Sequence, residues 1–214
     1  MITEYFTPDE ITTAVAKIYL QLWGKVRPEY DRLKKEFMKR RNSLKYPFVF
    51  AKTQTVTHDG NTYVVVYGSP NKKVDNFGCQ LFLVLNTSTG KRYYRLLTSG
   101  VPQVVTKHFM ERFIERSEYP VSKENFLLYL SKDMNYINPS VMGEQGKLYM
   151  LTESGLVVCT ESALITYINR NDLSSYKDEI GGELEDVLNQ MTQADILDRF
   201  KSNVINMLAK VRNN

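Results

Sequence analysis

The feature of this sequence that most constrains the fold is a series of five extended segments joined by short polar turns. These segments, rich in Val, Phe, Tyr and Thr, are residues 46–57, 62–67, 80–85, 92–97 and 103–106. Asp59 and Gly60, between the first two, readily supply the positive φ angles that a two-residue hairpin turn needs. Parallel strands need crossovers of about a dozen residues or more, so these short connections predict an antiparallel β-meander.

The residues before the meander follow a helical pattern. Thr7 can cap a helix, Pro8 suits its first position, and apolar residues then recur at helical spacing as far as Val26. Pro28 interrupts the pattern, and a second helical segment follows over residues 29–44. We therefore expect an N-terminal helical hairpin, with one long kinked helix as the alternative.

The second half of the chain mixes helical and extended patterns. Helical segments over residues 106–116 and 122–131 are followed by a loop over residues 133–146, a hairpin over residues 148–159 and a strand over residues 163–168. From Asp172 the pattern is helical again. The last helix is amphipathic, and its apolar face contains Leu197, Phe200, Val204, Leu208 and Val211.

This order of elements predicts an α+β fold with a mainly antiparallel sheet and helices packed on it. We expect one α+β domain with N-terminal helices over residues 1–171. Residues 172–214 should form a C-terminal helical segment that packs on the same domain, because isolated amphipathic helices cannot bury their apolar faces alone.

Composition narrows the class of protein. An aromatic fraction of 12% argues against disorder, and no apolar run approaches the roughly 20 residues that a membrane span needs. The first ten residues lack the apolar core of a secretory signal. Cys79 and Cys159 fit no metal-ligand spacing and are expected to be reduced thiols. We expect a cytoplasmic protein that does not bind a membrane and has no metal or other cofactor.

Charge is distributed unevenly along the chain. Residues 1–107 hold 17 Lys and Arg against 8 Asp and Glu, whereas residues 108–214 hold 11 against 16. This asymmetry favours an acidic partner for the N-terminal half or, equally, a contact between the two halves of the molecule. The candidate nucleic-acid-binding residues are the cations of the second helical segment: Lys34, Lys35, Lys39, Arg40, Arg41 and Lys45. Such a run is also typical of a solvated helix face.

Residues 104–116 contain the side chains in this sequence that are best suited to catalysis. If Thr106 is the N-cap, His108 lies in the first helical turn, near backbone N–H groups that favour a bound anion. Arg112 and Arg116 follow at intervals of four residues, so the three side chains project from one face. Histidine exchanges protons near neutral pH and arginine binds phosphate, which together suit the cleavage of a phosphodiester. The alternative is that the three residues form salt bridges within the molecule.

The segment from Thr106 to Arg116, followed by a Val-Ser-Lys-Glu helix start, resembles a known signature. The His-x-x-x-Arg-x-x-x-Arg pattern occurs in small uncharacterised bacterial and mobile-element proteins, some of them grouped with the barnase/EndoU/colicin/RelE-like superfold of ribonuclease toxins. This resemblance implies an antiparallel sheet with helices on one side and, in active members, RNA cleavage without a metal. This chain is longer than those proteins, and five predicted strands precede its helix.

Three functions follow from these observations. The first is a bacterial or phage-type protein that binds an acidic partner such as nucleic acid or an acidic protein. The second is a metal-independent RNA endonuclease that uses the His-Arg-Arg segment, with Tyr93, Tyr94 or Tyr149 as a second proton-transfer group. The third is a structural or protein-interaction subunit, which could form a homo-oligomer through its terminal helices. The sequence contains no P-loop, no Gly-x-Gly-x-x-Gly and no His-Glu-x-x-His motif.

Overall fold

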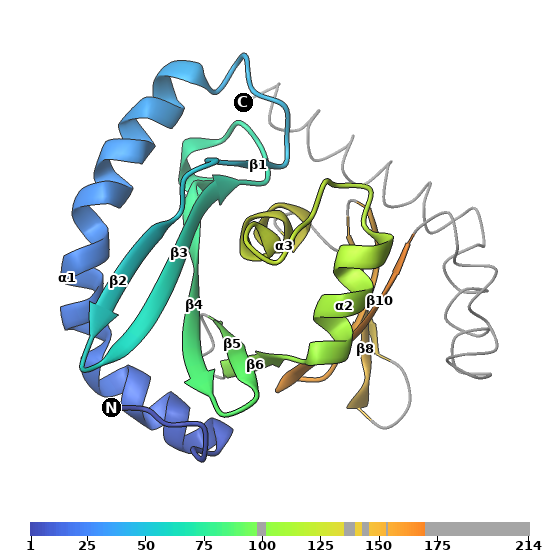
Figure 1. Ribbon diagram of the computed structural model, residues 1–214. Coiled ribbons are helices and arrows are strands. Elements are labelled where there is room, and N and C mark those ends of the chain that lie inside the picture. Colours follow the sequence, from blue (N-terminus) through green and yellow to red (C-terminus); the bar gives the residue numbers. More distant parts are fainter. Residues whose placement is uncertain (98–101, 135–139, 143–145, 153, 170–214) are drawn as a thin grey trace.

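The computed structural model describes residues 1–97, 102–134, 140–142, 146–152 and 154–169, which form an α+β fold (Figure 1). The helices are α1 (Pro8–Arg40), α2 (Lys107–Arg116) and α3 (Phe126–Met134), with a short 3-10 helix, η1 (Val74–Asn76). The strands are β1 (Phe48–Val49), β2 (Gln54–His58), β3 (Asn61–Ser69), β4 (Gly78–Thr87), β5 (Gly90–Leu96), β6 (Pro102–Val105), β7 (Ser140–Met142), β8 (Leu148–Leu151), β9 (Gly155–Cys159) and β10 (Ala163–Asn169). The predicted C-terminal helical segment, residues 172–214, lies outside the described residues.

The antiparallel meander is confirmed. Strands β2 to β6 pair in sequence order, and each pair is antiparallel. In the turn between β2 and β3, Asp59 has a φ of 48° and Gly60 a φ of 73°. Both residues therefore have a left-handed backbone conformation, as a two-residue hairpin turn of type I′ requires.

The sheet is mainly antiparallel, as predicted, but it has one parallel junction that the sequence did not indicate and one strand where a loop was expected. The described strands form one sheet in the order β1-β3-β4-β5-β6-β10-β9-β8-β7, with β2 also paired to β3. The junction between β6 and β10 is parallel, which is possible because α2 and α3 lie in the long connection between these strands. Strand β7 lies within residues 133–146, which the sequence predicted to be a loop.

The predicted N-terminal helical hairpin is wrong: α1 is a single helix of 33 residues. Thr7 and Glu10 form a capping box at its start. Gly24 and Pro28 are both exposed, so water can satisfy the Gly24 carbonyl that the missing N–H of Pro28 leaves free. The alternative of one long helix is therefore confirmed over these residues.

The apolar face of α1 continues on both sides of Pro28, which explains why the helix does not end there. Val26 and Leu33, before and after the proline, are both buried against the sheet. The Lys25 carbonyl also accepts a hydrogen bond from Gln54 Nε2 of β2 (3.2 Å). Burial of a continuous face and anchoring by β2 outweigh the intrinsic cost of a proline within a helix.

Helices lie on both faces of the sheet. Along β3, Tyr63, Val65 and Tyr67 belong to the core beneath α1, whereas Val64 and Val66 belong to the core beneath α2 and α3. This alternation follows from the two-residue period of a strand. In Figure 1 the sheet curls so that α2 and α3 lie between its two halves, while α1 lies on the outside.

The core beneath α2 and α3 is built from aromatic side chains. The ring of Phe113 lies 4.8 Å from that of Tyr167 on β10 and 5.7 Å from that of Phe126 on α3. Phe109, one turn before Phe113, is also fully buried. These two phenylalanines attach α2 to the sheet, and they thereby fix the position of its N-terminus.

Candidate anion-binding groove

Three hydrogen bonds around Thr106 fix the start of α2 against β10. Thr106 Oγ1 accepts from the backbone N–H of Phe109 (3.1 Å) and donates to the carbonyl of Ile165 (3.2 Å). The backbone N–H of Thr106 donates to the carbonyl of Leu164 (3.3 Å). Thr106 is therefore the N-cap, as predicted, and the first turn of the helix is anchored to a central strand.

The structure places His108, Arg112 and Arg116 in one stripe along the flank of α2 that faces β10. His108 is exposed, and its Nε2 lies 3.3 Å from Thr166 Oγ1 on β10. Arg112 forms an ion pair with Glu115 on its own helix (3.1 Å). Arg116 Nη1 donates to a backbone carbonyl of β10 (3.3 Å). The three side chains thus have different neighbours, and RNA cleavage by them stays a prediction.

A groove of about 960 Å³ lies beside the opposite flank of α2, where Lys107 and Met110 line it. Its other walls are the start of α1 with Phe6, the hairpin between β4 and β5, and the end of β6. Strand β5 begins at Gly90 but pairs with β6 only from Tyr93 onward. The first residues of β5 therefore extend past the end of β6, and the groove occupies the space that this leaves beside α2.

Four cationic side chains line this groove. Lys91 and Arg92 come from β5, Lys107 from the first turn of α2, and Lys123 from the turn before α3. One acidic side chain, Glu124, joins them in the lining, and Lys107 also pairs with Glu111 of its own helix (3.8 Å) just outside it. Hydrogen bonding, mainly from Ser122, lowers the pKa of Glu124, so this carboxylate is charged at neutral pH. The lining therefore has an excess of positive charge.

A smaller groove of about 350 Å³ continues from the first one along the sheet. The two share Lys91, Tyr93, Lys123 and Glu124, and the smaller one is also lined by threonines of β2 and β3. Tyr93 lies in the floor of both, with its ring 6.1 Å from that of Phe126. Burial, together with the charge of Glu124, raises the pKa of Tyr93, so its hydroxyl stays protonated and can donate a hydrogen bond.

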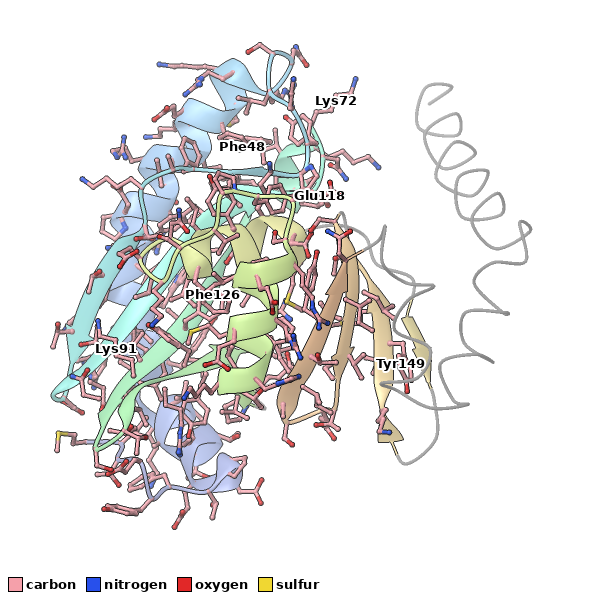
Figure 2. The ribbon with its side chains drawn as sticks, turned by 45° about the vertical axis from the view of Figure 1, so that its right-hand side comes forward. Phe48, Lys72, Lys91, Glu118, Phe126 and Tyr149 are labelled. Atoms are coloured by element: carbon pink, nitrogen blue, oxygen red, sulfur yellow. The ribbon has the colours of Figure 1, made fainter. Side chains whose placement is uncertain are left out.

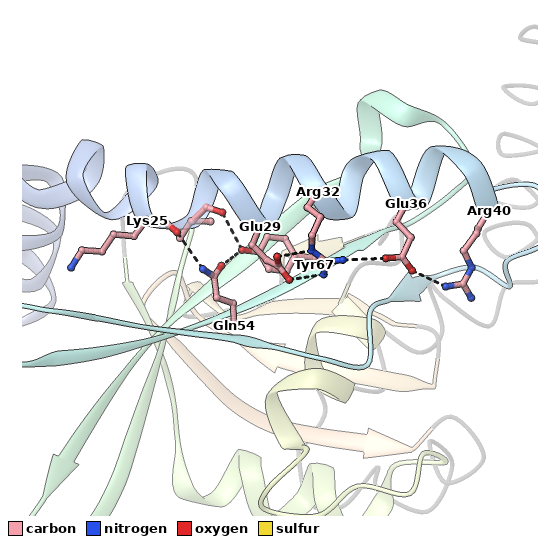
Figure 3. A network of polar contacts seen from close by, with 8 residues as sticks. Lys25, Glu29, Arg32, Glu36, Arg40, Gln54 and Tyr67 are labelled. Atoms are coloured by element: carbon pink, nitrogen blue, oxygen red, sulfur yellow. Dashed lines mark hydrogen bonds and ion pairs between the residues drawn. The ribbon is translucent and has the colours of Figure 1, made fainter.

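The cations of α1 that the sequence singled out lie on the outside of the molecule. Lys34 Nζ lies 5.8 Å above the ring of Tyr30. Arg40 pairs with Glu36 (2.9 Å), which also contacts Arg32 (3.5 Å), and Figure 3 shows this row of alternating charges along the helix. Part of the basic run is therefore neutralised by acids on its own helix.

The remaining cations of this run carry unbalanced charge. Within the described part of the chain, Lys35, Lys39, Arg41 and Lys45 form no ion pair. Three of them are exposed, and Arg41 is half-buried at the helix C-cap. They lie at the C-terminal end of α1 and just beyond it, whereas the groove lies between the start of α1 and α2, where apolar residues of both cores line it.

Sequence reasoning missed most of the groove. Lys91, Lys107 and Lys123 lie in three separate segments, and none of them belongs to a basic run longer than the pair Lys91-Arg92. Lys107 is the one cation of the lining that adjoins the segment predicted to bind an anion. The predicted N-cap at Thr106 was the one sequence signal for an anion site here. The other cations that line the groove come from distant segments, and only the fold brings them to this helix start.

The described residues contain no group of three or more His, Cys, Asp and Glu side chains that could hold a metal ion. Cys79 and Cys159 are free, and burial raises the pKa of each thiol to about 11. Both are therefore protonated and weakly reactive at neutral pH. Among the described helices, none has the length and apolar character needed to cross a membrane.

Comparisons with protein-family models, curated proteins and solved structures find no significant match to this chain. The geometry of the groove and the charge of its lining therefore carry the functional argument.

Proposed function

We propose that this protein binds nucleic acid by contacting phosphate groups in the groove between the β4–β5 hairpin and the start of α2. The convergence of four cations from three separate segments on one groove carries this proposal. A helix face can be basic simply to remain solvated, but cations from distant segments converge on a groove only through the fold. Lysine and arginine side chains in such a groove attract the phosphate backbone regardless of base sequence.

The start of α2 adds a second source of positive potential. Thr106 and Lys107 both line the groove, so the N-terminal end of α2 lies beside it. The first backbone N–H groups of a helix have no partner within the helix, and the aligned peptide dipoles favour an anion there. Phosphate oxygens match both the free donors and the side-chain charges.

A salt titration of binding tests the proposal. Fluorescence anisotropy with a labelled oligonucleotide would compare the wild type with the double variant Lys91→Gln/Lys107→Gln. The double variant Lys17→Gln/Lys52→Gln removes the same charge from exposed positions outside the groove. We expect the groove variant to lower the slope of log K against log salt concentration by about 2 and to weaken binding, with the control close to wild type.

Two outcomes contradict the proposal. One is the absence of measurable affinity of the wild type at about 50 mM salt, where phosphate contacts are strong. The other is an equal loss of affinity in the groove and control variants, because that result would show general attraction by net charge rather than a site.

A further inference from the structure

A second cationic surface lies at the other end of α1, and we name it the α1-end surface. It consists of Lys34, Lys35, Lys39, Arg41, Lys45, Lys72 and Lys73. The loop with Lys72 and Lys73 leads into η1, and the ring of Phe77 just after η1 stacks on Phe37 of α1 at 5.1 Å. This packing brings the lysines of the loop to the end of the helix, as the position of Lys72 in Figure 2 shows.

Within the described residues, two acids of α1 and η1 lie among or close to these cations in the sequence. Glu36 is engaged by Arg32 and Arg40, and Asp75 is the acid within η1. Because the surface carries seven cations, its charge suits an anionic polymer in the same way as the groove. A positively charged patch of this kind binds the phosphate backbone of a duplex without reading its sequence.

The groove and the α1-end surface are far apart. The groove includes Pro8, the first residue of α1, whereas Lys34 lies 26 residues further along the same helix. At about 1.5 Å per residue this separation is about 40 Å. Figure 2 shows Lys72 near the top of the view and Lys91, from the groove, well below it near the left edge.

The two surfaces also face different directions. The α1-end surface lies on the helix that covers the outer face of the sheet. Two cations of the groove, Lys107 and Lys123, belong to α2 and to the turn before α3, on the inner face, while the start of α1 contributes an apolar wall. A straight duplex lying along the outside of α1 therefore cannot also enter the groove. Two separate segments of nucleic acid can occupy the two surfaces at the same time.

We propose that this protein bridges two segments of nucleic acid, one held in the groove and the other on the α1-end surface. The inference rests on the proposed function, since it takes the groove to be the first binding site. Bridging raises the local concentration of the second segment without any additional contact, as linked binding sites generally do.

A capture experiment separates bridging from simple binding. A duplex is fixed to beads, protein is added at about 50 mM salt, and capture of a second, fluorescent duplex is measured. The variants are Lys91→Gln/Lys107→Gln in the groove and Lys35→Gln/Lys39→Gln/Lys72→Gln on the α1-end surface. Lys17→Gln/Lys52→Gln is the control. Affinity for a single free duplex is measured for each protein in parallel.

We expect the wild type and the control to capture the fluorescent duplex. Each surface variant should still bind a single duplex but lose at least about tenfold in capture, because only one of the two linked sites remains. Capture by each variant alone at the wild-type level would overturn the inference, since a dimer with two copies of one surface would explain it.

The remaining outcomes separate the two proposals. Wild-type protein that binds a free duplex without capturing a second one overturns bridging and leaves nucleic-acid binding intact. A groove variant with no affinity for a duplex also overturns bridging, because it would show that the α1-end surface does not hold nucleic acid by itself. No binding of a free duplex by the wild type overturns both proposals.

Discussion

The groove beside α2 and the outer face of α1 are both cationic, but their charges arise in different ways. On α1, the basic residues follow one another along a helix, and Glu29 and Glu36 neutralise part of them at the spacing of one turn. In the groove, cations from β5, α2 and the turn before α3 line one concave surface, and only Lys107 among them pairs with an acid of its own helix in the described residues. The charge of a helix can thus be predicted from the sequence, whereas a concave cationic site depends on which segments the fold brings together.

The largest expected effects on stability come from substitutions in the two cores. Phe113→Ala and Phe37→Ala each remove a fully buried ring, and each should lower the free energy of unfolding by about 3–5 kcal/mol. Loss of Phe113 loosens α2 on β10, so we expect it also to weaken nucleic-acid binding in the groove. Urea denaturation and anisotropy would be measured on both variants under conditions where each is folded.

Phe37 packs beneath the end of α1, on the other side of the sheet from α2. Groove binding by the Phe37→Ala variant should therefore stay close to wild type. If both variants lose binding to the same extent, the two regions are not independent, and the distinction drawn between them is wrong.

The two N-caps provide a smaller and cleaner contrast. Thr7 caps α1 and Thr106 caps α2, each through a side-chain oxygen that accepts a backbone hydrogen bond. Replacing either threonine by alanine should cost about 1 kcal/mol of stability. Thr106→Ala should weaken binding more than Thr7→Ala, because Thr106 itself lines the groove beside Lys107, whereas Thr7 lies between two apolar lining residues, Phe6 and Pro8. Equal effects of both variants on binding would argue against a site at the start of α2.

Substitution of His108 distinguishes nucleic-acid binding from RNA cleavage. His108 lies on the flank of α2 that faces β10, away from the lysine that lines the groove. We expect His108→Ala to leave nucleic-acid affinity unchanged. The same variant tests the predicted ribonuclease activity: cleavage of RNA by the wild type that is lost in His108→Ala would support it. Equal, null activity in both proteins would reject it.

The smallest effect is expected in the ion pairs of α1. A hydrogen bond from Arg32 lowers the pKa of Glu29. Arg32→Gln should therefore raise the pKa of Glu29 toward its ordinary value, which a carboxyl NMR titration would detect. A lowered pKa stabilises the fold above the unfolded-state pKa of the acid, and this stabilisation is lost as the pH falls through the folded-state value.

Arg32 is exposed and Glu29 is half-buried at the surface of the helix, so the contribution of this pair to stability should be small at neutral pH and smaller still at high salt. An unchanged Glu29 pKa in the Arg32→Gln variant would show that the row of charges seen along α1 is not formed in solution.

Where prediction from the sequence failed, the physical reason can be identified. Pro28 suggested a break because a proline inside a helix removes a hydrogen bond, yet the buried residues on both sides of it keep α1 on the sheet. The parallel pairing of β6 and β10 could not be predicted, because residues 102–105 and 163–169 are far apart in the chain. Local patterns of apolar and polar residues do not indicate which distant segments of a chain will pair.

By itself, the sequence determined the local structure: the helix starts at Thr7 and Thr106, the tight turn at Asp59 and Gly60, the meander, and the buried face of α2. These features depend on backbone preferences and on apolar residues spaced a few positions apart. The tertiary structure alone decided that Lys91, Lys107 and Lys123 surround one groove, and that the basic end of α1 lies on the other face of the sheet. Packing of distant segments sets both outcomes, since burying the apolar faces of α1 and α2 against opposite sides of one sheet leaves their cations pointing in different directions.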